Sequence, residues 1–128
     1  MSVAGSRTAP AHYYEGSDFV GKLVRDGIPS IIRSARRVAN IRALDTEDFR
    51  AALGDKLVEE VAELRGAGDA DAVVEEAADV LEILLAIVAE HGPTLDSIVD
   101  IARRKRVERG GFAMRVWLEN ADQAPTAP

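Results

Sequence analysis

The feature that most constrains the fold is a pair of apolar patterns with helical spacing. The first runs along residues 49–64, where large apolar residues recur every three or four positions. The second runs along residues 73–88 and is apolar on two nearly opposite faces. This spacing predicts two α-helices, and a helix that is apolar on both sides is expected to be buried between partners. Because the glycines of "GAGDA" predict a tight turn between them, we expect the two helices to be antiparallel.

Local signals place the ends of these helices and predict two more. Asp45 or Thr46 is expected to cap the first helix of the pair, and the second is expected to run from about Asp71 to His91. Before the pair, a short helix with Pro29 in its first turn is expected, with Asp26 as its cap and an end near residue 37. After the pair, a helix is expected to begin near residue 94 and to end in "RRKRVERGG".

These elements predict an all-α fold with a bundle of about four helices. Its domain is expected to cover residues 19–118, between disordered arms at residues 1–18 and 119–128. A length of 128 residues suits one domain with a real core. The segment "GFAMRVWLEN" is expected to be extended, and it can pair with "VANIRAL" as a small C-terminal ribbon.

Composition argues against several functional classes. The chain has no cysteine, which excludes disulfides, thiolate metal sites and cysteine nucleophiles. A net charge of -6 argues against binding a nucleic-acid polymer through an overall basic surface. The longest apolar run is interrupted by Glu82 and is too short to span a bilayer. The N-terminus has no apolar signal-peptide segment, so we expect a cytoplasmic protein without a membrane partner.

Two clusters of acidic residues lie on the central helix pair. They consist of Glu59, Glu60 and Glu63 on the first helix, and of Glu75, Glu76 and Asp79 on the second. At about 100° per residue, each cluster borders or enters an apolar face. Ionised carboxylates there are costly unless cations or donors meet them. Pairing with arginines is one solution, and a hard divalent cation is the other, with Mg²⁺ preferred and Mn²⁺ as a substitute.

Magnesium held by carboxylates commonly shares its coordination with a phosphate. The chain offers basic residues that could hold such a phosphate: Lys22, Arg25, Lys56, Lys105 and Arg109. Each of them, taken alone, could equally be a solvated or salt-bridging side chain.

The acidic pattern, "EEVAE" at 59–63 and "EAAD" at 76–79, resembles the paired motif of the MazG-like all-α nucleoside triphosphate pyrophosphohydrolases. The flanking "KLVRDGIPSII" and "KRVERGGF" resemble its phosphoribosyl-ATP pyrophosphohydrolase-like subgroup. The resemblance implies a helical fold completed by dimerisation, with a tetramer also possible. It implies hydrolysis of a nucleotide at the α-phosphorus to a nucleoside monophosphate and pyrophosphate, in a house-cleaning role.

The resemblance also assigns roles to residues. The implied Mg²⁺ ligands are Glu60, Glu63, Glu76 and Asp79, and the implied catalytic residues are Glu59 and Glu60, with Glu59 orienting the attacking water. Lys56, Lys105 and Arg109 would hold phosphate oxygens. Gly27 and Ser30 stand where the subgroup commonly has lysine and glutamate. Three alternatives stay open: a phosphoribosyl-ATP pyrophosphohydrolase or dUTPase, a catalytically weak nucleotide-binding or regulatory dimer, and a structural dimer whose acids pair with arginines.

Overall fold

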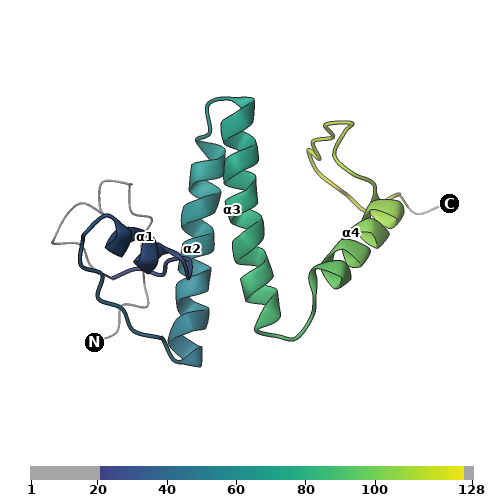
Figure 1. Ribbon diagram of the computed structural model, residues 1–128. Helices are drawn as coiled ribbons and strands as arrows, with labels where there is room; N and C mark the ends of the chain where they lie inside the picture. The colour runs from purple at the N-terminus through teal and green to yellow at the C-terminus, as the bar shows by residue number, and fades with distance from the viewer. Residues whose placement is uncertain (1–20, 126–128) are drawn as a thin grey trace. The chain divides into compact units, whose positions relative to one another are not determined.

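The computed structural model describes residues 21–125, which form four α-helices and no strand (Figure 1). The helices are α1 (Ile28–Ser34), α2 (Thr46–Arg65), α3 (Ala70–Ala89) and α4 (Leu95–Arg109). The all-α prediction is therefore confirmed for the described part of the chain. The chain divides into two units, Met1–Thr94 and Leu95–Pro128. The predicted arm at residues 1–18 lies outside the described residues.

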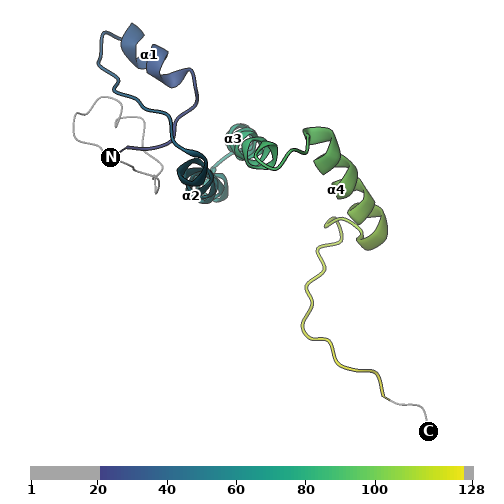
Figure 2. The ribbon, with the colours of Figure 1, turned by 90° about the horizontal axis from the view of Figure 1, so that it is seen from below.

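The antiparallel pair of α2 and α3 dominates the first unit, and the two helices lie side by side in both ribbon views (Figures 1 and 2). The Asp45 carboxylate caps α2 by accepting a 2.8 Å hydrogen bond from the Asp48 N–H. The Asp69 carboxylate caps α3 in the same way, accepting from the Ala72 N–H at 2.8 Å. Gly66 is the C-cap of α2. Local capping therefore sets the tight turn between the helices.

Packing between α2 and α3 covers only part of their apolar surface. Among the described residues, the buried hydrophobic side chains are Ala52 and Leu53 of α2. On α3, the face that carries Ile83 is half-buried, but Val74 and Leu81 on the other face are 68% and 46% exposed. The prediction of two apolar faces on this helix holds, with one of them largely open within the described chain.

The short helix α1 differs from its prediction at both ends. Pro29 does lie in its first turn, but Asp26 is not its cap: the N-cap position is Gly27, and no side chain caps the helix. The reason is a turn that begins one residue before Asp26, in which the Ile28 N–H donates to the Arg25 carbonyl. The helix ends at Ser34, before the predicted residue 37, because Arg36 adopts a left-handed φ of 62°.

In the second unit, α4 is followed by residues 110–125 without helix or strand. Gly110, with a φ of 85°, ends the helix as a left-handed C-terminal glycine does. The predicted ribbon is wrong for the described residues, because Arg115 has a φ of 58° and its N–H donates to the Phe112 carbonyl in a turn. An extended strand cannot continue through such a residue.

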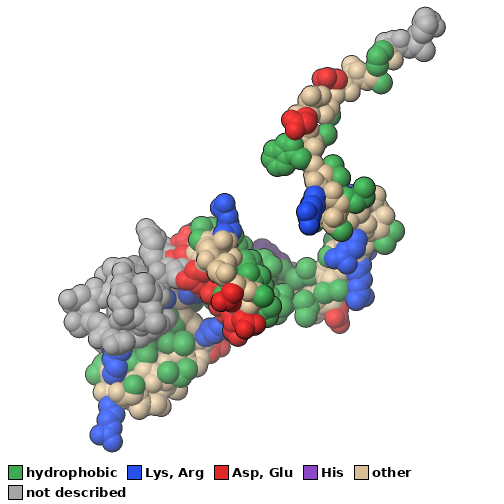
Figure 3. All heavy atoms as spheres, turned by 90° about the horizontal axis from the view of Figure 1, so that it is seen from above, with side chains coloured by type: hydrophobic (Ala, Val, Ile, Leu, Met, Phe, Trp, Pro, Cys, Tyr) green, Lys and Arg blue, Asp and Glu red, His purple; other side chains and the backbone are tan. Residues whose placement is uncertain are grey.

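The surface carries many apolar side chains. Figure 3 shows them among the charged groups of both units, and the most exposed include Phe112, Trp117 and Val107. No helix in the described part of the chain is long and apolar enough to cross a membrane.

Candidate metal centre

The antiparallel packing of α2 and α3 brings three glutamates together. Glu60 and Glu63, one turn apart on α2, face Glu76 of α3. One carboxylate oxygen from each of the three lies within 4.8 Å of the others. We call these residues the glutamate triad. Three of the four predicted metal ligands therefore converge at one place.

Several buried carboxylate oxygens in and beside the triad have no hydrogen-bond donor among the described residues. Glu60 is only 7% exposed. No described residue donates a hydrogen bond to its Oε2, to Glu76 Oε2, or to either carboxylate oxygen of Glu59, although all four atoms are buried. A buried carboxylate oxygen without a partner is costly. A single cation at the triad would satisfy the oxygens from both helices at once, so the donor set fits a hard divalent ion.

The electrostatics of the triad also favour a bound cation. Burial raises the pKa of Glu63 to about 7, and contact with the carboxyl groups of Glu60 and Glu76 adds to the rise. Three carboxylates this close resist being ionised together. The triad therefore favours a bound positive charge, either a proton or a metal ion.

Two of the predicted basic residues lie beside the acids. Lys56 Nζ is 3.6 Å from Glu60 Oε1, one helical turn away, and both side chains are largely buried. Burial lowers the pKa of Lys22, while the charges of Glu59, Glu60 and Glu63 oppose that change. The segment before α1 therefore reaches the acidic flank of α2.

Asp79, the fourth predicted ligand, does not lie in the triad. Its Oδ1 accepts a 2.8 Å hydrogen bond from Arg25 Nη2, in an ion pair whose side chains are 42% and 56% exposed. Both residues are predicted site residues, but their pairing was not predicted, because no local pattern links positions so far apart. Lys105 and Arg109 lie exposed on α4, in the second unit, and their role in the site stays a prediction.

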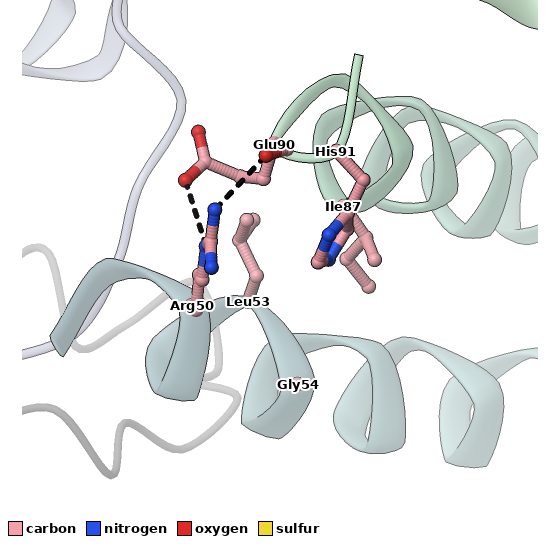
Figure 4. A pocket seen from close by; sticks show the side chains of 6 residues that line it. All are labelled: Arg50, Leu53, Gly54, Ile87, Glu90 and His91. Carbon is pink, nitrogen blue, oxygen red and sulfur yellow. Dashed lines mark hydrogen bonds and ion pairs between the residues drawn. The ribbon is translucent and has the colours of Figure 1, made fainter. Parts of the chain in front are cut away.

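A separate hollow of about 140 Å³ lies near the start of α2 and the end of α3 (Figure 4). Its lining residues are Arg50, Leu53, Gly54, Ile87, Glu90 and His91. Arg50 donates to the Glu90 carboxylate at 3.2 Å and to the Glu90 carbonyl at 2.9 Å. These bonds tie the end of α3 to α2, whereas the triad lies further along the pair. We therefore regard the hollow as separate from the metal centre.

Comparison with known proteins adds one relative. A protein of Mycolicibacterium smegmatis, described as an uncharacterized protein, is 50% identical over 56 residues. The match covers 44% of this chain and 57% of that protein, so the chain spans little more than half the length of this relative. No family model matches the chain, and no solved structure matches it.

Proposed function

We propose that this chain is a Mg²⁺-dependent nucleoside triphosphate pyrophosphohydrolase of the MazG-like kind. The observation that carries the proposal is the glutamate triad, in which oxygens from two helices converge and no described residue donates to the buried Glu60 Oε2 and Glu76 Oε2. The reaction class comes from the resemblance of residues 59–63 and 76–79 to the paired acidic motif. The proposed role is house-cleaning of the nucleotide pool in the cytoplasm.

The proposed metal ligands are the glutamate triad, with Asp79 as the fourth. Their oxygens suit Mg²⁺, and Mn²⁺ could replace it. When bound, the ion would offset the phosphate charge and lower the pKa of the attacking water. Two glutamates on α2 and two acids on α3 would then hold it from both sides.

Glu59 is the proposed general base. Both of its carboxylate oxygens are buried, no described residue donates to them, and Glu60 follows it in the chain. As the water oxygen attacks the α-phosphorus, Glu59 would accept the water proton. The bond from the α-phosphorus to the bridging oxygen breaks, and pyrophosphate leaves with that oxygen. Glu60 would contribute to catalysis as the most buried ligand.

The basic residues are proposed to bind the phosphates of the substrate. Lys22 and Lys56 already lie beside the acids, where they balance part of the negative charge. A triphosphate would give both ammonium groups oxygen acceptors. Arg25, Lys105 and Arg109 are the further candidates for this contact. No contact among the described residues distinguishes one nucleobase from another. The candidate substrates are therefore dUTP, phosphoribosyl-ATP and damaged nucleotides.

We also propose that the chain acts as a homodimer, with a tetramer as the larger possibility. The open apolar face of α3, with Val74 and Leu81 exposed, supports this proposal. A helix that is apolar on both sides requires a second partner to bury the face that α2 leaves uncovered.

Pyrophosphate release tests the function. The substrates would be common NTPs and dNTPs, dUTP, oxidised or deaminated nucleotides, and phosphoribosyl-ATP, each with Mg²⁺, Mn²⁺ or EDTA. We expect release with either metal ion and none with EDTA. If no nucleotide is hydrolysed but metal and nucleotide together raise the melting temperature, the chain is a binding module. If neither response occurs, the acids are structural.

A further inference from the structure

We propose that Arg25 is a latch on Asp79 that opens when the metal binds. Arg25 Nη2 donates a 2.8 Å hydrogen bond to Asp79 Oδ1. Metal binding at the glutamate triad would draw the Asp79 carboxylate away, and the freed guanidinium would become available to a substrate phosphate. This inference rests on the proposed function and deepens it, because it predicts that the metal binds before Arg25 contacts the substrate phosphate.

The triad provides a site to which Asp79 can move. Glu60 is more than nine-tenths buried, and no described residue donates to its Oε2. Asp79 follows Glu76 by three positions on α3, so the two side chains lie on the same side of the helix, one turn apart. A change of side-chain rotamer, without movement of the helix, can therefore bring the Asp79 carboxylate toward an ion held by the triad.

The ion pair that must break is a weak one. The side chains of Arg25 and Asp79 are 56% and 42% exposed, and ion pairs with that much access to water contribute little to stability. The pair of Lys56 and Glu60, by contrast, is almost fully enclosed. A divalent cation therefore meets less resistance in taking Asp79 from Arg25 than in displacing Lys56.

The freed arginine would stay near the acids of α2 and α3. Arg25 follows Lys22, which lies close enough to the acids of α2 for their charges to act on its pKa. The backbone at Arg25 is fixed by a turn, in which its carbonyl accepts from the Ile28 N–H at 3.0 Å. The side chain can therefore move while its anchor stays in place. A guanidinium held there can bind a phosphate through two parallel hydrogen bonds.

Calorimetric titration of the full chain with Mn²⁺ alone tests the latch. The variants are Arg25→Gln, Asp79→Asn, their combination, and Arg42→Gln as a control that removes the same charge from an exposed loop. We expect Arg25→Gln to bind Mn²⁺ more tightly by roughly two- to fivefold, the equivalent of one exposed ion pair. Asp79→Asn should bind more weakly, and Arg42→Gln should match the wild type. Circular dichroism would verify that each variant is helical.

The combined variant separates the latch from simple charge removal. If Arg25 acts through Asp79, then Arg25→Gln has no further effect once Asp79 is asparagine. An equal gain in that background would mean that Arg25 acts only by long-range repulsion, and the latch would be wrong. Weaker or unchanged binding by Arg25→Gln would also overturn it, with the proposed function intact. Absence of Mn²⁺ binding by the wild type would overturn both.

Discussion

Lys56 Nζ lies 3.6 Å from Glu60 Oε1, and the two side chains are only 14% and 10% exposed. Among the described residues, this is the most enclosed ion pair. It places one positive charge at the glutamate triad, which is too little to neutralise three carboxylates. Under the proposed function, Lys56 would keep the Glu60 carboxylate as its partner until a metal ion bound the carboxylates, and would then be available to a phosphate.

Replacing Lys56 by glutamine should destabilise the metal-free protein by about 1–3 kcal/mol, because Glu60 would lose its buried counter-charge. Mg²⁺ should restore much of this loss, since it supplies the missing positive charge. Urea unfolding with EDTA and with Mg²⁺ would measure both effects. Arg42→Gln, an exposed change of the same charge, is the control; an equal loss in the two variants would contradict a specific role for Lys56.

Replacing Glu63 by glutamine should lower metal-dependent turnover by roughly 100-fold or more, because one of the three proposed triad ligands is lost. The matched control is Glu82→Gln, which alters an exposed acid on α3. Pyrophosphate release and circular dichroism would be measured for both proteins. Near wild-type turnover in a folded Glu63→Gln protein would remove Glu63 from the ligand set.

The raised pKa of Glu63, about 7 against an ordinary value of 4.5, predicts how stability depends on pH. The folded state binds this proton more tightly than the unfolded state, so the proton stabilises the fold as pH falls from about 7 toward 4.5. In EDTA, the melting temperature should therefore be higher near pH 5.5 than near pH 8. Because other groups also titrate, the informative quantity is the difference between wild type and Glu63→Gln.

Saturating Mg²⁺ should weaken or reverse this dependence, since metal ions and protons compete for the same oxygens. Thermal melts over the same pH range, with and without Mg²⁺, would show it. Identical pH profiles for wild type and Glu63→Gln in EDTA would contradict the assignment of the raised pKa to this residue.

The open face of α3 predicts the effect of a charge at Leu81, which is 46% exposed. Leu81→Glu should shift the chain from dimer to monomer, because a carboxylate would be buried without a partner in the interface. Light scattering after gel filtration would give the mass of each form. Glu82→Gln, at the next position, serves as the control. A dimer that persists in Leu81→Glu would place the interface elsewhere.

Sequence reasoning worked best where a signal was local. Asp45 precedes the first helical residue by one position, and the structure shows its carboxylate in the cap. Likewise, the spacing of Glu60 and Glu63 is enough to put them on one side of α2, and the short turn before α3 then sets Glu76 opposite them. Helical periodicity and the predicted turn were therefore sufficient to predict that the triad residues lie together.

The failures came from contacts and conformations that no local pattern contains. Arg25 and Asp79 pair although they are 54 positions apart in the sequence. Arg25 lies in a segment without helical periodicity, so its position could not be predicted. The left-handed backbone at Arg36 and Arg115 was equally unforeseen, because arginine has no preference for that conformation. These two residues account for the early end of α1 and for the absence of the predicted ribbon in the described chain.

The small number of buried apolar side chains has a consequence for the life of the protein in a cell. The described residues bury little apolar surface, so the proposed dimer would contribute much of the folding free energy. Its resistance to unfolding would then rise with its own abundance, and newly made copies at low concentration would be the most vulnerable to proteases. If the proposed dimer forms, expression level would thus affect how long each molecule survives.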